Sequence, residues 1–267
     1  MSISRLSLLI LLAIFATSIQ AETINCTPIT TLPATITAQG IYCLTGNLAT
    51  SQISGNAITI NANNVTLDLN GWKVGGQAAG TSTQANGIFS SANNVTIKNG
   101  IVRGFLYGIY LGGSGVVVRD MLADSNTYAG IYITGLGALV EHNQVVNTGG
   151  STINNGVSAV GIEANGNSSI VSDNMVAGIT VAGNGNETGI GVAGSYSAVR
   201  NNVVSNTAQP SIGTSDGISM SEGIALNNTV SNFVVGISSD GIYAYNTVYG
   251  CDNDFLGGTA GAGNSGT

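Results

Sequence analysis

Four ionisable side chains that could do chemistry occupy equivalent positions of a repeat. Lys98, Arg119, His142 and Asp173 each stand directly before an Asn or Asp that recurs along the chain. If the repeats stack, the four side chains form one column that could hold an anionic ligand and supply a base. The alternative is a solvated edge where Arg119, His142 and Asp173 only pair, and exposed pairs contribute at most about 1 kcal/mol. These four residues are therefore weak catalytic candidates.

Glu163 is a further weak catalytic candidate, because spacing alone places no second carboxylate beside it. Asp216 and Glu222 stand on another repeat, whereas glycosidases need two carboxyl groups within about 5 to 9.5 Å. Asp252 and Asp254 form an acidic pair that could bind calcium, yet they lack the later Glu of an EF-hand loop. Zinc-ligand spacing, a phosphate-binding loop and a Gly-x-Ser-x-Gly motif are also missing. We therefore expect no metal and no cofactor, with calcium as a minor alternative.

Net charge and the N-terminal segment exclude two classes of protein. The chain has 6 Lys and Arg against 13 Asp and Glu, a formal net charge of −7. That charge excludes a nucleic-acid binder that works by neutralising phosphates. Residues 1–21 combine a short basic start, an apolar run and a small-residue end, which is typical of a secretory signal peptide. The apolar run is too short to span a membrane, so we expect a secreted protein, extracellular or periplasmic, without a membrane span.

The three cysteines fit export to an oxidising compartment. Cys26 and Cys43 are close in sequence and are predicted to form a disulfide there. Cys251 is then left over, either as a buried or free thiol or as a partner in an intermolecular bridge.

A short repeat of variable length dominates the rest of the chain. Each unit has a Gly-Ile pair, a short β-prone run and then an Asn or Asp at a nearly fixed distance from the Gly. Units of about 20 residues cannot bury an apolar face alone, so they must stack on one another. The Gly-Ile pairs begin at Gly87, Gly108, Gly130, Gly161, Gly189, Gly217 and Gly236. The Asn or Asp positions, including one from an earlier unit, are Asn70, Asn99, Asp120, Asn143, Asn174, Asn202, Asn228 and Asn246.

Stacked β-units of this length predict a parallel solenoid. In such a solenoid, equivalent residues of successive turns lie about 4.8 Å apart and form columns. An Asn column at a bend is favourable because each amide can donate to one neighbour and accept from another. We predict an all-β fold, a parallel β-helix of about eight coils in which the eight Asn and Asp residues form an internal ladder.

The sequence resembles a known family of repeat proteins. The Gly-Ile strands, the Asn column and the lead-in GIYCLTGNL followed by NNVTLDLNG are similar to exported right-handed parallel β-helix proteins of the pectate-lyase superfamily, over roughly Gly40 to Gly250. The resemblance implies long polysaccharide ligands lying along one sheet. It does not imply one activity, because members include lyases, hydrolases, epimerases, phage tailspikes and adhesins. We expect a single β-helix domain over 22–250, with a lead-in or cap at 22–55, and a Gly-rich tail at 251–267.

An outward column of side chains follows from strand alternation. If each Ile of a Gly-Ile pair points inward, Phe89, Tyr110 and Tyr132 point outward on one face, followed by Glu163. Aromatic faces on a flat sheet suit the apolar faces of sugars, although they could serve only to stabilise the sheet. The long intervals add segments 148–160, 179–188 and 205–216, which should stack into a wall beside this face.

These patterns predict that the protein binds extended polysaccharide or a cell-surface glycan without catalysis. The binding residues would be Phe89, Tyr110, Tyr132 and Glu163. Two alternatives remain open. One is a polysaccharide lyase or glycoside hydrolase of the same superfamily. The other is a structural or adhesive surface protein that self-associates through its solenoid ends, because residues 257–267 do not resemble a capping helix and an uncapped end leaves a strand edge free to pair.

Overall fold

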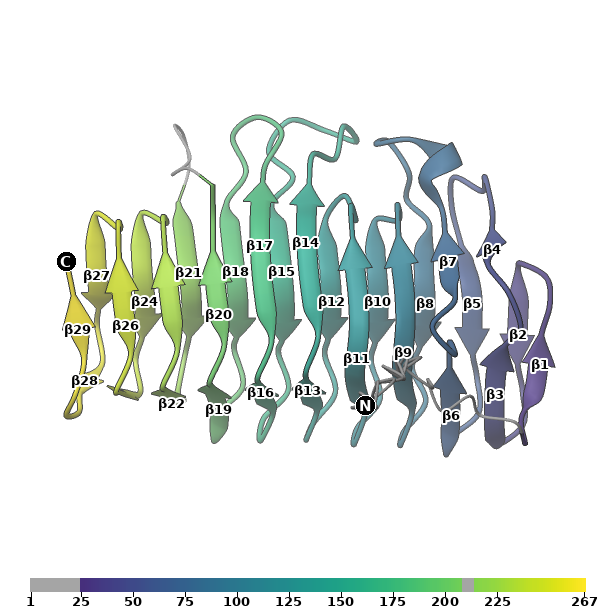
Figure 1. The fold of residues 1–267 in the computed structure, drawn as a ribbon, viewed down its shortest axis with the longest axis horizontal. Coiled ribbons are helices and arrows are strands. Elements are labelled where there is room, and N and C mark those ends of the chain that lie inside the picture. Colours follow the sequence, from purple (N-terminus) through teal and green to yellow (C-terminus); the bar gives the residue numbers. More distant parts are fainter. Residues whose placement is uncertain (1–24, 208–213) are drawn as a thin grey trace, which may run out of the picture.

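The chain folds into a long solenoid of parallel β-strands (Figure 1). The computed structural model describes residues 25–207 and 214–267, so the expected signal peptide, residues 1–21, lies outside the described residues. Every strand pairs in parallel with the strand one coil away, and the strands of each coil are divided between two sheets. The prediction of an all-β parallel β-helix is confirmed.

One sheet consists of the Gly-Ile strands and their equivalents. It has ten strands within the described residues, and its pairings follow chain order from the N-terminal to the C-terminal end. The strands are β2 (Ala34–Ile36), β5 (Asn56–Ile60), β8 (Asn86–Ser90), β10 (Tyr107–Leu111), β12 (Ala129–Ile133), β15 (Ala159–Ala164), β18 (Glu187–Val192), β21 (Ser215–Met220), β24 (Val235–Ser239) and β27 (Asn253–Leu256).

The second sheet forms the rest of the coil wall and contains two ladders, which the long strands β9 (Thr96–Arg103) and β11 (Val117–Asp124) join. The first ladder comprises β1 (Thr27–Ile29), β3 (Gly40–Leu44), β6 (Val65–Asp68), β13 (Leu139–Glu141), β16 (Ile170–Ser172), β19 (Ser197–Arg200), β22 (Gly223–Leu226), β25 (Ile242–Ala244) and β28 (Thr259–Ala260). The second comprises β4 (Leu48–Ala49), β7 (Lys73–Gly75), β14 (Gln144–Gly149), β17 (Met175–Thr180), β20 (Val203–Ser205), β23 (Thr229–Ser231), β26 (Thr247–Tyr249) and β29 (Ser265–Gly266). A single turn of 3-10 helix, η1 (Gln77–Ala79), follows β7.

Core packing explains why each repeat has a Gly-Ile pair. Both residues of each pair are buried, and the isoleucines align in register from Ile88 to Ile237. A Cβ added to Gly189 would lie 2.3 Å from Cγ1 of Val204 and 2.5 Å from the carbonyl oxygen of Gly217. Such distances leave no room for a side chain. The Gly therefore lets the two walls of the coil approach, while the Ile fills the core.

A ladder of buried Asn side chains follows the bend between the two ladders of the second sheet. Nδ2 of Asn174 donates to the carbonyl of Val140 at 2.9 Å and to Oδ1 of Asn202 at 3.0 Å. Its Oδ1 accepts hydrogen bonds from the backbone N–H and from Nδ2 of Asn143. Every polar atom of the Asn174 amide is thus paired, as burial requires. The ladder comprises Asn143, Asn174, Asn202, Asn228, Asn246 and Asn264.

The predicted ladder register is wrong at its first three positions. Strand pairing places Met121, not Asp120, opposite Asn143. Asn70, Asn99 and Asp120 instead occupy the preceding bend position, with φ values of 49°, 56° and 55°. Asn and Asp tolerate this left-handed conformation better than most residues, so the same residue types recur there for a different reason.

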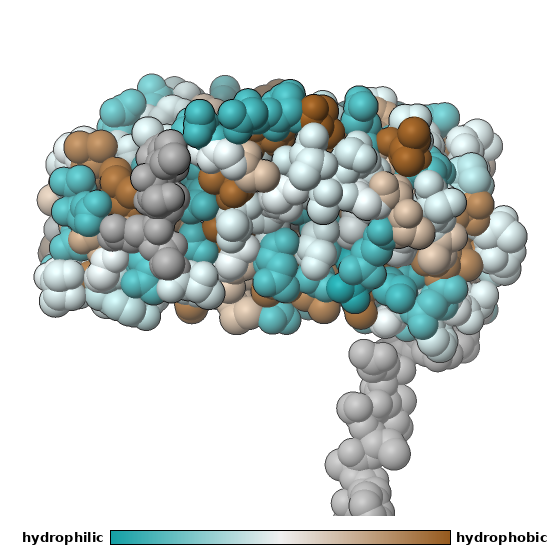
Figure 2. Space-filling model, turned by 90° about the horizontal axis from the view of Figure 1, so that it is seen from above, coloured by the Kyte–Doolittle hydropathy of each residue, from teal (hydrophilic) through white to brown (hydrophobic). Residues whose placement is uncertain are grey.

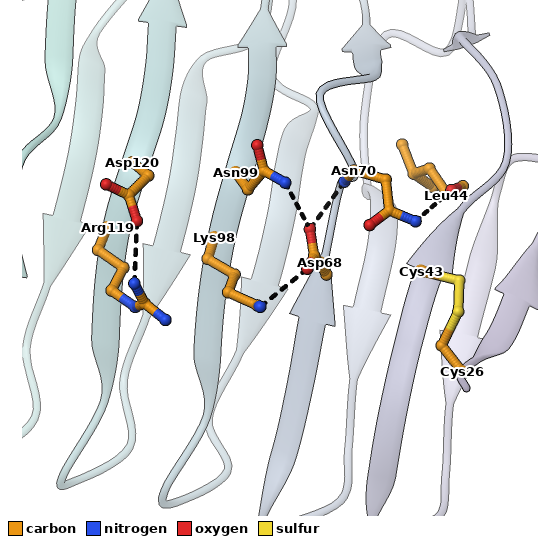
Figure 3. Close-up of polar contacts among 9 residues, drawn as sticks. All are labelled: Cys26, Cys43, Leu44, Asp68, Asn70, Lys98, Asn99, Arg119 and Asp120. Atoms are coloured by element: carbon orange, nitrogen blue, oxygen red, sulfur yellow. Dashed lines mark hydrogen bonds and ion pairs between the residues drawn. A yellow bond between two sulfur atoms is a disulfide. The ribbon is translucent and has the colours of Figure 1, made fainter. Parts of the chain in front are cut away.

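The β-helix has more coils than predicted, and it continues past the expected C-terminal bound of residue 250. The ten-stranded sheet exceeds the expected eight coils, because β2 and β27 lack a Gly-Ile pair and still join it. Residues 22–55, expected as a lead-in, contribute β1 to β4, and the expected tail, 251–267, forms β27 to β29, which pair with the preceding coil. The Cys26–Cys43 disulfide is confirmed (Figure 3), and Cys251 is a partly buried free thiol.

Candidate functional site

The outward face of the ten-stranded sheet carries two columns of side chains, because Gly and Ile of each repeat both face inward. One column follows the Ile and the other precedes the Gly. In the first, pairing aligns Phe89, Tyr110, Tyr132 and Glu163 on β8, β10, β12 and β15. Gly191, Ser219 and Ser238 continue this column on β18, β21 and β24.

Five aromatic rings form one cluster on this face. Tyr107 precedes the Gly of β10, and its ring centroid lies 5.1 Å from that of Tyr110, 5.1 Å from that of Tyr132 and 5.0 Å from that of Tyr128. Phe89 joins through Tyr110, with centroids 5.4 Å apart. The sequence analysis missed Tyr107 and Tyr128, because it considered only the residue after each Ile. We call these five residues the aromatic cluster.

The rings of the aromatic cluster do not stack face to face. Tyr110 meets Phe89 at 88° and Tyr132 at 80°, so neighbouring rings pack edge to face. This arrangement matches the quadrupoles of the rings better than face-to-face stacking does. All five side chains are partly buried. The cluster therefore presents a mixture of ring faces, ring edges and hydroxyl groups to solvent.

Tyr107, Tyr128 and Tyr132 of the cluster stay protonated at neutral pH, because their pKa values are raised. Burial, with smaller contributions from neighbouring tyrosines, raises the pKa of Tyr107 to about 12. Burial also raises the pKa of Tyr128 and of Tyr132, and in both cases the Glu163 carboxylate adds to the rise. Their hydroxyl groups can therefore both donate and accept hydrogen bonds.

Glu163 leans over the next strand because that strand has no side chain at the facing position. Oε2 of Glu163 lies where a Cβ of Gly191 would otherwise be. Asn165 hydrogen-bonds the Glu163 carboxyl and also donates to the Tyr132 hydroxyl at 3.4 Å. Burial raises the pKa of Glu163 to about 7, and the Asn165 hydrogen bond opposes this rise only in part. A carboxyl group with this pKa can change its charge near neutral pH.

A polar hollow adjoins Glu163 on its C-terminal side. Its volume is about 150 Å³, and Glu163, Thr188, Gly191, Ser219 and Ser221 contribute to its lining. The hydroxyl groups and the carboxyl group can each exchange hydrogen bonds with a bound hydroxyl. The hollow continues the line of the aromatic cluster, because Gly191 and Ser219 belong to the same outward column.

The four ionisable residues predicted to form one column do not do so. Lys98 and Arg119 pair in register, but the next residue in their column is Glu141. His142 and Asp173 lie at the following bend position, where both have positive φ. The predicted column is wrong because His142 and Asp173 were aligned with Lys98 and Arg119. Strand pairing instead aligns His142 with Asp120, one position further along the chain.

The two cations of that column, Lys98 and Arg119, already have carboxylate partners (Figure 3). Nζ of Lys98 lies 2.8 Å from Oδ2 of Asp68, a carboxyl group that is buried and also accepts from the side chain of Asn99. Arg119 pairs with the neighbouring Asp120 at 3.0 Å on the surface. Both cations lie on the second sheet, away from the aromatic cluster, and serve as charge partners there.

Two other carboxyl groups with raised pKa values lie on strands of the ten-stranded sheet. Burial raises the pKa of Asp216, which stands on β21 in the outward column that precedes the Gly. Burial also raises the pKa of Glu187, whose side chain is buried and accepts from the N–H of Val181 and from Nδ2 of Asn206. Glu187 thus links the loop after β17, through Val181, to the following coil, through Asn206.

Metal-ligating residues do not cluster in the part of the chain that the structure describes: no group of three or more His, Cys, Asp or Glu side chains comes together there. Asp252, of the pair considered for calcium, is exposed, and Asp254 is partly buried on β27. Among the same residues, no helix has the length and apolar character to cross a membrane.

Two of the three expected loops rise from the same edge of the solenoid, after β14 and after β17 (Figure 1). The third, 205–216, includes residues 208–213, which lie outside the described residues. Thr152, in the loop after β14, pairs through its backbone N–H and its hydroxyl with Thr81, in the loop that follows η1. Figure 2 views this edge from above and shows mostly polar and neutral residues, with apolar side chains in small separate groups.

Known structures share this fold, although no protein-family model matches the chain and no curated protein matches it. The Dettilon tailspike protein superposes with a TM-score of 0.59 and 19% identity, covering 88% of this chain and 51% of its own. Tailspike protein 2 from Escherichia coli O157:H7 bacteriophage CAB120 gives 0.54 and 12%, covering 86% and 38%. A mutant tailspike of E. coli bacteriophage HK620, in complex with a pentasaccharide, gives 0.50 and 12%, covering 86% and 60%.

These similarities define the class of fold, the right-handed parallel β-helix, to which this chain belongs. The chain spans between 38% and 60% of the length of these three structures. Identities this low carry the fold and no activity, so function must be argued from the site.

Proposed function

We propose that the outward face of the ten-stranded sheet binds an extended polysaccharide without cleaving it. The observation that carries this proposal is the aromatic cluster, which continues directly into Glu163 and the polar hollow. From β8 to β21 this track crosses six strands, about 24 Å at about 4.8 Å per strand. A track of that length can contact several sugar units of one chain. Apolar rings with a few convergent polar groups are the usual composition of a ligand site.

The sheet does not need the aromatic cluster for its own pairing. In the same outward column, Thr59, Ser219 and Ser238 occupy strands that pair in the same parallel register. Among the described residues, the outward-facing aromatic side chains are therefore confined to a few adjacent strands of a regular sheet, and this concentration favours a ligand over a general structural role. The disulfide supports a location in an oxidising compartment, where glycans are accessible.

Tyrosine variants provide the first test, on glycan binding and on unfolding together. Tyr132→Ala should weaken binding to a responsive oligosaccharide by about 1–3 kcal/mol, on the scale of aromatic stacking with nucleobases. Because Tyr132 contacts three other rings, its loss should also cost about 1–3 kcal/mol of stability. Tyr249→Ala removes an exposed tyrosine of the second sheet and should leave binding unchanged. Loss of stability with unchanged binding would assign the cluster to the sheet alone.

A second variant separates binding from stability, because it leaves the cluster intact. Ser219→Trp would fill the hollow from the outward column and should abolish binding of glycans that extend past Glu163. Thr229→Trp adds the same ring to β23 in the second sheet and serves as the matched control. If both tryptophan variants bind as the parent does, the glycan does not use this track.

Catalysis is the second candidate function, because a carboxyl group with a pKa of about 7 suits proton transfer at neutral pH. In that case Glu163 would be the acid or base, and Glu163→Gln would abolish product formation while binding persisted. Release of reducing ends or unsaturated products from a polysaccharide panel would establish this activity. Its absence, with binding retained, supports the binding function.

A further inference from the structure

Among the described residues, the Lys and Arg side chains lie on only one of the two sheets. Within residues 25–207 and 214–267, no Lys, Arg or His lies on a strand of the ten-stranded sheet. The basic residues of that part of the chain lie on the second sheet, on β7, β9, β11 and β19, and they are Lys73, Lys98, Arg103, Arg119 and Arg200. The proposed track therefore has no cationic side chain among its own strands.

Acidic groups, in contrast, are present on the track. Glu163 stands in the outward column after the Ile, and Asp216 in the outward column before the Gly. Three of the basic residues on the other sheet already have carboxylate partners. Lys98 pairs with Asp68, Arg103 with Asp124 and Arg119 with Asp120. Among the residues that the structure describes, no strand of the track thus offers a cation to balance a bound anion.

From this distribution we infer that the glycan bound by this face is uncharged, an inference that rests on the proposed function. A polyuronate would bring a row of carboxylates beside Glu163 and Asp216, with like charges facing each other and no counter-charge. A polycation would find only two outward-facing acidic side chains on the described strands of the track, Glu163 and Asp216, because Glu187 on β18 is buried. The hydroxyl groups of Thr188, Ser219 and Ser221, the Glu163 carboxyl and the tyrosine hydroxyls match a ligand whose polar groups are hydroxyls.

The inference also specifies what Glu163 does in binding. Its carboxyl group lies against Gly191, at the boundary between the aromatic cluster and the hollow. Ionised, it accepts hydrogen bonds from sugar hydroxyls, and protonated, it also donates one. Tyr128 and Tyr132 face it from β12 and its preceding turn, and both stay neutral because burial raises their pKa values. A neutral sugar is therefore tolerated in either protonation state of Glu163, whereas a uronate is opposed by the ionised state.

Pairs of oligosaccharides with the same backbone, one member charged and the other neutral, test this inference on the purified protein. The pairs are oligogalacturonate and its carboxyl-reduced form, oligomannuronate and its carboxyl-reduced form, and chitosan and chitin oligomers. Calorimetric titration is done at pH 8 for the uronate pairs and at pH 5 for the chitosan pair, whose amino groups are protonated only in acid. It should detect binding only to neutral oligomers, or a preference for the neutral member of at least about tenfold, a difference of about 1.4 kcal/mol. Raising NaCl from low to high concentration should change the neutral affinity by less than about twofold, since no ion pair is screened.

Two variants connect the result to the track. Glu163→Gln removes the facing charge and should narrow the gap between the members of a uronate pair by about fivefold or more at pH 8. Asp173→Asn changes an exposed acid at a bend of the second sheet and should leave the gap as it is. A uronate or chitosan oligomer that binds as tightly as its neutral partner would overturn the inference and leave glycan binding standing. If no oligomer binds, neutral or charged, the proposed function fails and the inference fails with it.

Discussion

Replacing Glu163 by Gln should stabilise the protein, and the gain should grow as the pH rises. In the folded protein, burial raises the pKa of this carboxyl from 4.5 to about 7. Between these two values the folded state holds a proton that the unfolded state has released, so wild-type stability falls with increasing pH. At about 1.4 kcal/mol per pKa unit, the full effect is about 3 kcal/mol. It is absent below about pH 4 and complete above about pH 8.

The measurement is the free energy of unfolding in urea at pH 4, 5, 6, 7 and 8, for wild type and for Glu163→Gln. The variant keeps the shape of the side chain, so the two proteins should be nearly equal at pH 4 and differ by about 3 kcal/mol at pH 8. Asp216 and Glu187 also have raised pKa values and lower wild-type stability in the same direction. The difference between the two curves removes their contribution, because both proteins contain these groups.

Glu222→Gln is the matched control, since it removes a carboxyl group from an exposed turn. Its difference from wild type should stay within about 0.5 kcal/mol at every pH. Two results would refute the reasoning about Glu163. One is a difference that does not depend on pH, and the other is a variant that loses stability relative to wild type as the pH rises.

Three further predictions concern the coils themselves. Asn174→Ala should cost about 2–4 kcal/mol of unfolding free energy in denaturant, because it leaves the buried backbone partners of the amide unpaired. Asn201→Ala, on the exposed bend position one residue away, should cost about 1 kcal/mol or less, and equal losses would disprove the register. Gly189→Ala should cost at least about 1–3 kcal/mol by overpacking, whereas Gly46→Ala, with open space around it, should stay within about 0.5 kcal/mol in the same titration. Reducing the disulfide of the first coil should lower stability by about 3 kcal/mol for a loop of this size, and an unchanged unfolding midpoint after reduction would contradict that.

The fold could be predicted from the sequence because the repeat directly records the coil. Each Gly-Ile pair marks a strand that faces the core, and the seven pairs, together with the earlier unit that contains Asn70, are sufficient to require stacking. The count was too low because the terminal coils meet only one neighbour and need not keep the same motif. β2 has Ala34 where β5 has Ile58, and β27 places Phe255 where the preceding strand has Ile237. A search for the motif therefore cannot find these coils, although their backbones pair in the same way.

The ladder register shifts by one position between Asp120 and Asn143. The recurring Asn or Asp lies one position further from its Gly at Asn143 than at Asn99 or Asp120. That single position separates two physically different places in the bend. The first has positive φ and faces outward, and the second faces inward, where amides pair between coils. Asn suits both places for different reasons, so residue type alone cannot assign the register. Spacing alone cannot assign it either, because Asn228 and Asn246 belong to the inward ladder and stand closer to their Gly than Asn99 does.

The properties of Glu163 depend on contacts that spacing does not determine. Column alignment predicted that Glu163 follows Tyr132, and strand pairing shows the same alignment. Its raised pKa, however, comes from burial against the neighbouring coil, where Gly191 leaves room for the carboxyl group to lie down on the sheet. A side chain at position 191 would occupy this space, so we expect the carboxyl group to be less buried and its pKa to be raised less. The pKa of Glu163 thus depends on the residue at position 191. This position is distant from Glu163 in sequence but adjacent to it in space, and it is occupied by Gly.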